Sequence, residues 1–435
     1  MAIAVPEGVL FAAMVGFAEQ WFLVDAIRLG AGSIEQALVV GLPLCVGALG
    51  PLLALRWLAR GASRKSLTAG FVAAQSLAVL AMALLDAIGL QTPRLLVLGA
   101  CLYQVCGQGS GTPWASWYGD VVPERMRGGY FARRTRAVQY GIAAAMVGAG
   151  LLLQTFEPTL CFGATTHAWW PAGALAGRGF ALIFLLSGLA RGASAVLLTF
   201  SPEPRFSGIA TTAKVVQFLR TTRGSNAWRI VAGSAAFYLT VYLASPFFVP
   251  FMARELGFSY LQLMFALAIQ IALKAALQHR FGTAIDRHGA RAVWLLAALL
   301  CAIVPLPFVW SHGMAWVTTS QLLSGIAWGS FEVALFVLLL ETTFRATRPH
   351  AVAAQSVMNG LGQLCGSLIG GVFLAASDQR FRLLFGVSLV LRLAVALLLP
   401  KLVHPNSDRP GSGARDLLRR IVGLAPEGGG DRLAP

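Results

Sequence analysis

Twelve apolar stretches, each long enough to cross a bilayer, follow one another along almost the whole sequence. A transmembrane helix needs about 20 predominantly apolar residues. Apolar residues make up 57% of the chain and charged residues only 12%, which is roughly half the charged share of soluble domains. The sequence therefore predicts an all-α, polytopic membrane protein with twelve transmembrane helices. The predicted spans are Val9–Leu29, Glu35–Leu58, Leu67–Leu90, Leu95–Gly119, Ala137–Leu153, Gly179–Phe200, Val231–Met252, Leu261–Phe281, Val293–Trp310, Trp316–Leu340, Val352–Ala375 and Leu383–Leu399.

Basic residues fall mostly on one side of the predicted membrane. With the N-terminus inside, 25 of the 34 lysines and arginines lie in inward-facing segments and 6 in outward-facing ones. By the positive-inside rule, this bias predicts cytoplasmic N- and C-termini. It leaves no basic stripe with interleaved aromatic residues, so a nucleic acid is not an expected partner. The excess of arginine over lysine, with abundant alanine, predicts a bacterial protein of the inner membrane.

The two halves of the sequence resemble each other. The segment LGAGSIEQ near Leu29 matches LGFSYLQ near Leu256, and two further pairs of segments match in the same order. These matches align Arg60 with Arg287, Arg64 with Arg291, Asp120 with Glu341, and Arg191 with Arg392. Six spans repeated in the same orientation are typical of a two-lobed transporter. The predicted parts are a first six-helix lobe (1–200), a linker (201–229), a second six-helix lobe (230–402) and a cytoplasmic tail (403–435).

One loop carries a recognisable signature. The stretch GTAIDRHGAR, from Gly282 to Arg291, has the pattern G-x-x-x-D-R-x-G-x-R and falls between the eighth and ninth predicted spans. The sequence thereby resembles the major facilitator superfamily, over roughly residues 8–400. Its first-half counterpart, WLARGASRKS, keeps the arginines but has Ala59 in place of the aspartate. The resemblance implies a small-molecule transporter whose lobes rock about a central site, and it does not identify the substrate.

The loops of this signature are candidate gates. Glycines permit a tight turn, a carboxylate can face the positive end of a helix, and arginines can pair with acids at other helix ends. We expect such contacts to hold one conformation of the two lobes, although plain topogenic charge also accounts for the arginines. The candidate gating residues are Arg60, Arg64, Asp120, Gly282, Asp286, Arg287, Gly289, Arg291 and Glu341.

Charged residues at mid-depth of the predicted spans are candidates for function, because such a residue costs about 2.5–3.5 kcal/mol to insert. Glu19 lies roughly 16 Å along the first span at 1.5 Å per residue. Lys274 and Glu332 lie at equal depths, which predicts an ion pair between them. We expect Glu19, and secondly Glu332, to carry a coupling proton or cation. Arg191 and Arg392 fall on spans that the family resemblance makes peripheral, where snorkelling or a lobe-stabilising bond is expected instead.

Polar residues spaced by four form stripes on single faces of several predicted helices. The resemblance places these helices at or beside a central cavity. Hydrogen bonding between packed helices, worth about 0.6 kcal/mol per contact, explains the amides equally well. The candidate substrate- or ion-binding residues are Glu19, Gln20, Gln104, Gln108, Tyr238, Tyr242, Gln270, Lys274, Glu332, Asn359 and Gln363.

Motifs of enzymes and pumps are missing from the sequence. It contains no GxxxxGK[ST] loop, no HExxH, no nucleophile elbow and no Cys/His cluster. We therefore expect no enzyme activity, no cofactor and no metal, and a secondary transporter (symporter or antiporter) that works as a monomer in the lipid bilayer. The alternative is a transporter-shaped protein that binds a partner or handles lipid, suggested by the unmatched outer loop at 155–178.

Overall fold

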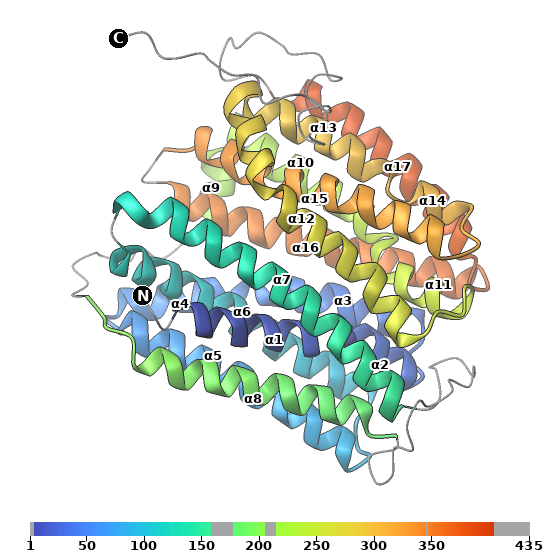
Figure 1. Ribbon diagram of the computed structural model, residues 1–435. Helices are drawn as coiled ribbons and strands as arrows, with labels where there is room; N and C mark the ends of the chain where they lie inside the picture. The colour runs from blue at the N-terminus through green and yellow to red at the C-terminus, as the bar shows by residue number, and fades with distance from the viewer. Residues whose placement is uncertain (1–3, 123, 158–176, 205–214, 345–346, 404–435) are drawn as a thin grey trace.

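The computed structural model describes residues 4–122, 124–157, 177–204, 215–344 and 347–403, and all regular elements in these ranges are helices (Figure 1). The first lobe consists of α1 (Ala4–Phe17), η1 (Glu19–Trp21), α2 (Phe22–Arg28), α3 (Ser33–Gly47), α4 (Leu49–Ala59), α5 (Arg64–Ala87), α6 (Pro93–Val121), α7 (Glu124–Phe156) and α8 (Gly179–Thr199). After the short α9 (Val215–Thr221), the second lobe consists of α10 (Asn226–Tyr242), η3 (Ser245–Phe247), α11 (Phe248–Arg254), α12 (Tyr260–His288), α13 (Ala290–Ile303), α14 (Leu306–Val309), α15 (Met314–Glu341), α16 (Arg348–Ala376) and α17 (Phe381–Leu402).

The chain is a polytopic membrane protein, as its sequence predicts. Eleven helical segments in the described ranges are long and apolar enough to cross a membrane. The twelfth span is α6, which has 29 residues and is less apolar than the other eleven because its sequence includes Gln104, Gln108 and Ser110. Some of this polarity is used inside the first lobe, since Gln104 donates to Glu19. Twelve spans in two six-helix lobes are therefore confirmed.

The two lobes repeat an unusual feature, an interruption in their first spans. A 3-10 turn separates α1 from α2 at Glu19–Trp21, and another separates α10 from α11 at Ser245–Phe247. Pro246 lacks a backbone N–H, which favours the second interruption. Other side chains bind carbonyl groups released at these breaks: Trp21 Nε1 donates to Gly16 O at 3.1 Å, and Arg392 donates to Val241 O at 2.8 Å. The parallel repeat seen in the sequence is thus visible in the backbone.

The lobes meet along two helix pairs, α3 with α16 and α7 with α12. We call the end of the bundle that carries Arg60 and Arg287 the basic end, and the opposite end, where α3 and α12 begin, the far end. At the far end, Gln379 Nε2 donates to Ser33 Oγ across the lobes at 2.7 Å. The rings of Trp21 and Tyr260 also meet there, with centroids 6.2 Å apart. One buried apolar cluster includes residues of both lobes at this end, which is therefore closed.

The basic end has a different arrangement. Its buried apolar clusters each belong to a single lobe. The ion pairs Arg64–Asp120 and Arg134–Glu7 at this end each lie within the first lobe. Figure 1 shows α7 and α12 separating from one another away from the far end. The structure is therefore a conformation closed at the far end, with the lobes apart at the basic end.

Helix α16 packs unusually close to two neighbours, because glycines line both of its contact faces. Gly362, Gly366 and Gly370 face the backbone of α10, and an added Cβ at each would lie 2.1–2.4 Å from an α10 carbonyl oxygen. On its other side, Gly360 touches the backbone of α3 at Cys45. Small residues at every fourth position allow helix backbones to approach in this way. Helix α16 thus joins the core of its own lobe to the first lobe.

The predicted part boundaries remain predictions. Helix α10 begins at Asn226, inside the predicted linker 201–229. Residues 158–176 of the outer loop, 205–214 of the linker and 404–435 of the tail lie outside the described ranges.

Candidate functional site

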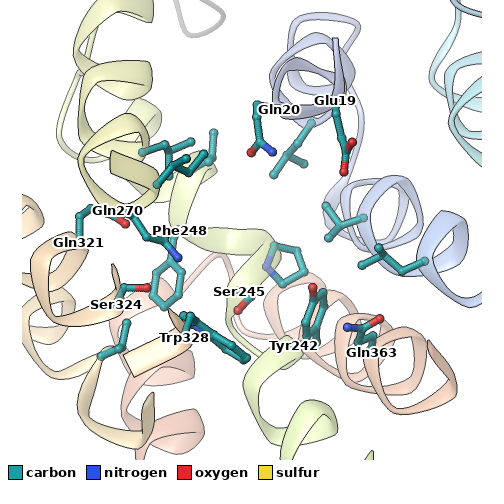
Figure 2. Close-up of a pocket in the computed structure, with 18 of the residues that line it drawn as sticks. Glu19, Gln20, Tyr242, Ser245, Phe248, Gln270, Gln321, Ser324, Trp328 and Gln363 are labelled. Atoms are coloured by element: carbon teal, nitrogen blue, oxygen red, sulfur yellow. The ribbon is translucent and has the colours of Figure 1, made fainter. Parts of the chain in front are cut away.

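A cavity of about 670 Å³ lies between the lobes. Side chains from both lobes line it, and Figure 2 shows Glu19 and Gln20 of the first lobe facing a space bordered by Gln270, Ser324 and Trp328 of the second. This volume is in the usual range of small-molecule sites, about 300–1,000 Å³. Both interrupted spans contribute to its wall at their breaks. The cavity is the candidate binding site.

Glu19 lies at the break between α1 and α2 and lines the cavity. Its carboxylate accepts hydrogen bonds from Tyr103 Oη at 3.0 Å and from Gln104 Nε2 at 3.1 Å, both on α6. The side chain is only partly exposed. These bonds join the break in the first span to the fourth span, so a change in the charge of Glu19 alters a contact between two helices.

The ion pair predicted between Lys274 and Glu332 is present. Lys274 Nζ on α12 lies 2.5 Å from Glu332 Oε2 on α15, two helices that pack against each other. Their side chains are 26% and 48% exposed, respectively, and both line the cavity. A charged pair in hydrogen-bond contact avoids leaving either ion alone at membrane depth.

Aromatic rings form one wall of the cavity. Tyr238 stacks on Trp328 with ring centroids 5.7 Å apart and an interplanar angle of 30°. Tyr242 follows one helical turn after Tyr238, with centroids 6.2 Å apart, and Phe248 lines the same space. Tyr238 also meets Phe331, a buried residue of the lobe's core. The rings on the cavity side are therefore held in place by packing behind them.

Nine of the eleven candidate binding residues line the cavity. The two that do not are Gln108, whose amide packs against Gly47 of α3, and Asn359, whose side chain accepts a hydrogen bond from Ser234 at 2.9 Å. Packing between helices, the alternative considered for these amides, is what the structure shows for both.

The sequence analysis missed several lining residues. The largest group is on α15, where Gln321, Ser324 and Trp328 precede Glu332 on the cavity side. Their spacing of three and four residues is a helical stripe that the sequence itself contains. Gln139 on α7 was also missed, and it has no such pattern around it.

The gating contact predicted in the first lobe is present in part. Arg64 is buried, and its NH1 lies 2.6 Å from Asp120 Oδ2. The same guanidinium donates to Ser116 and to the carbonyl of Pro204. Arg60 has an exposed side chain. The Arg64–Asp120 pair lies within one lobe, so it fixes α5 to α6 and does not join the lobes here.

The second-lobe loop differs from expectation in two respects. Gly282 is not in a turn, because α12 continues to His288, and the turn is made by Gly289 with a φ of 83°. Arg291 does not meet Glu341, which is exposed, and instead donates to Val403 O at 2.8 Å and Pro400 O at 3.0 Å. Arg291 thus occupies carbonyl groups left open where α17 ends. Asp286 and Arg287 lie in the last turn of α12 with exposed side chains.

The two arginines expected to stabilise the lobes do so by different contacts. In the first lobe, Arg191 donates to Gln75 at 2.7 Å and lies 3.9 Å from the buried Glu7. In the second, Arg392 has no acidic partner among the described residues. It donates instead to Ser388 Oγ, Cys301 O and Val241 O, at the breaks of two spans.

The described ranges contain no group of three or more His, Cys, Asp or Glu side chains placed to hold a metal ion.

Comparison with known proteins agrees with this architecture. Residues 230–426 match the profile of the Major Facilitator Superfamily, whereas no curated protein sequence matches the chain. A variant of the nucleoside transporter NupG is similar in structure, with a TM-score of 0.68 and 12% identity, covering 92% of this chain and 100% of that one. The D-xylose–proton symporter has a TM-score of 0.67 and 15% identity, covering 94% and 98%.

A third similar structure comes from a bacterial homologue of the human lysosomal transporter Spinster in an inward-facing, occupied conformation. It has a TM-score of 0.65 and 15% identity, covering 93% of this chain and 98% of that one. At such identities the similarity establishes the fold only. The second half of the chain therefore matches the Major Facilitator Superfamily, and both lobes share the fold of these solved transporters.

Proposed function

We propose that the protein is a secondary transporter that moves a small solute across the membrane by alternating access. The observation that carries this proposal is the cavity between the lobes, which is lined from both and closed at the far end only. Two lobes that rock about a shared site expose it to one side at a time. The similar solved structures include transporters of nucleosides and of D-xylose, which supports a solute of small size.

The orientation follows from the charges. The basic end carries most of the loop arginines, and the positive-inside rule places such loops in the cytoplasm. We therefore infer that both termini are cytoplasmic and that this conformation faces inward. The arginine-rich composition supports a bacterial inner membrane, and we infer that a monomer suffices, because one chain lines the whole cavity.

Glu19 is the residue we assign to coupling. It is the one carboxylate lining the described cavity that has no cationic partner, since Glu332 is paired with Lys274. A carboxylate held by neutral donors at membrane depth can bind and release a proton more readily than one fixed in an ion pair. Protonation would weaken its bonds to α6 and so couple the proton to the first span. We infer no enzyme activity and no cofactor.

The test uses proteoliposomes with a pH gradient and a labelled solute chosen because it raises the melting temperature of the purified protein. We expect wild-type protein to accumulate this solute against its gradient. Glu19→Gln should retain exchange of the solute at equal concentrations but lose accumulation driven by the pH gradient. The control is Asn359→Leu, which changes a polar residue outside the cavity and should accumulate the solute as wild type does. Full pH-driven accumulation by Glu19→Gln would show that coupling lies elsewhere.

The partner-binding alternative has no observation in its favour. The loop that suggested it, 155–178, lies mostly outside the described residues.

A further inference from the structure

The charged side chains that line the cavity already have partners within the protein. Lys274 and Glu332 pair with each other, and Glu19 accepts two hydrogen bonds from α6. Arg392 donates three hydrogen bonds to groups of its own lobe. The lining side chains thus carry two formal positive and two formal negative charges, all engaged. Lys274 and Glu332 neutralise each other, and Glu19, the residue assigned to the coupling proton, is neutral when that proton is bound.

The unengaged polar groups of the cavity are uncharged. Five glutamine side chains line it without a hydrogen-bond partner among the described residues, and they come from five different helical segments of both lobes. They are Gln20, Gln139, Gln270, Gln321 and Gln363. Each carboxamide offers two donors and one acceptor group. A ligand with many hydroxyl, carbonyl or ring-nitrogen groups could use both functions of each amide.

The aromatic wall adds a second requirement. Trp328 and Tyr242 are each partly exposed and line the cavity, and Figure 2 shows Ser245 near both rings and Gln363 beside Tyr242. Flat aromatic faces bind the flat or apolar face of a ring and contribute about 0.5–1.5 kcal/mol beyond buried area. A cyclic solute with polar substituents can stack on these aromatic rings and form hydrogen bonds with the glutamine amides at the same time.

We propose that the substrate is an uncharged cyclic solute rich in hydroxyl or amide groups, with its ring against Trp328 and Tyr242 and its polar edge on the glutamines. This inference rests on the proposed transport function and names its substrate class. A lone cation or anion would lose its hydration and would meet only charges that are paired, hydrogen-bonded within the protein, or neutralised by the coupling proton. A neutral solute avoids that cost. Monosaccharides and nucleosides both have the required chemistry.

The experiment measures the melting temperature of the purified full-length protein with four groups of probes. Two groups are uncharged, the monosaccharides D-xylose and D-glucose, and the nucleosides uridine and adenosine. Two are charged, the cation tetraphenylphosphonium and the dianion succinate. We expect concentration-dependent stabilisation by at least one uncharged group and by neither charged probe. Stabilisation by monosaccharides alone or by nucleosides alone distinguishes the two uncharged sources.

A matched pair of variants locates the binding. Gln270→Leu removes a cavity amide, whereas Gln278→Leu changes the same residue type two turns further along α12, where the side chain is exposed outside the cavity. We expect the apparent Kd of the stabilising probe to rise about five-fold or more in Gln270→Leu, as for loss of one hydrogen bond. Gln278→Leu should bind as wild type. Both variants should melt as wild type without ligand, which excludes misfolding as the cause.

Two results would overturn the proposal. One is failure of every uncharged probe to stabilise the protein, and the other is equal binding by Gln270→Leu and wild type. If a charged probe is then transported into proteoliposomes, the transport function stands and only the substrate class is wrong. If no probe of any group is exchanged across the membrane, both the class and the proposed function fail.

Discussion

Replacing Gly366 with alanine tests the close contact between α10 and α16. A Cβ at this position would lie 2.2 Å from Leu239 O, 3.0 Å from Leu239 C and 3.1 Å from Leu243 N. Carbon–oxygen contacts between packed helices are normally about 3.3–3.6 Å. The added methyl group therefore needs about 1 Å more space. All three atoms belong to the backbone, so no rotamer change can provide it.

The cost follows from what must move. Helix α16 is held by α10 on one side and by α3 on the other, through Gly360 and Cys45. Moving it away from α10 also opens the contacts at Gly362 and Gly370, and a gap of 0.5–1 Å forfeits about a quarter to a half of the dispersion energy there. Overpacking of this kind costs about 1–3 kcal/mol. At about 2 °C per kcal/mol, the lower value for large domains, the melting temperature should fall by about 2–6 °C.

The assay is thermal unfolding of the purified protein in detergent, with Gly386→Ala as the control. Gly386 lies inside α17, and an added Cβ there would meet nothing within 4 Å. Alanine is a better helix former than glycine by up to about 1 kcal/mol, so the control should melt at the wild-type temperature or above. If Gly366→Ala also melts there, the packing argument for α16 is wrong.

Three further changes probe other parts of the molecule. Ser33→Cys combined with Gln379→Cys, bridged by a short reducible bis-methanethiosulfonate reagent, should hold the far end closed and stop solute exchange until a reductant is added; continued exchange by the cross-linked protein would argue against far-end opening. Arg392→Met should lower the melting temperature by several degrees, because losing the donor to a buried carbonyl costs about 1–3 kcal/mol; Cys301 O loses its Arg392 donor, and Val241 O keeps only the N–H of Ala244. An unchanged melting temperature would contradict this role. Burial raises the pKa of Glu157 above its ordinary value of 4.5, against the opposing effect of Arg28. The folded chain then holds this proton to higher pH than the unfolded chain, so stability falls as pH rises from about 4.5 to the folded pKa and stays level above it. The melting temperature of Glu157→Gln relative to wild type should accordingly rise across that window, and a difference independent of pH would refute the assignment.

Several features of the site could be predicted because they depend on position along a helix. Depth follows from counting residues, so Lys274 and Glu332 could be placed at one level and their ion pair expected. The same counting placed Glu19 at the centre of the membrane. The polar stripes did not predict that Gln108 and Asn359 lie outside the cavity. Residue spacing shows which residues share one face of a helix, but not which neighbouring helix that face meets. Which neighbour covers the face depends on how the helix is rotated in the bundle.

The loop signature shows the same limit. Its residues resemble those of a known family, but the sequence did not reveal that α12 continues through Gly282 or that Arg291 would bind the end of α17. A guanidinium can pair with an acid or with open carbonyl groups, and the choice depends on which helix end lies within reach. Such distances exist only in the folded chain.

The sequence by itself determined the class of this protein, its twelve spans and its duplicated lobes, since hydrophobic length and charge bias act on each segment independently of the others. Only the tertiary structure decided which end is closed, which side chains share the cavity, and that Lys274 and Glu332 pair while five cavity glutamines stay without partners among the described residues. The physical reason is that pairing is a relation between helices distant in the chain. Their rotation and approach, set by contacts such as the glycine faces of α16, bring the partners together.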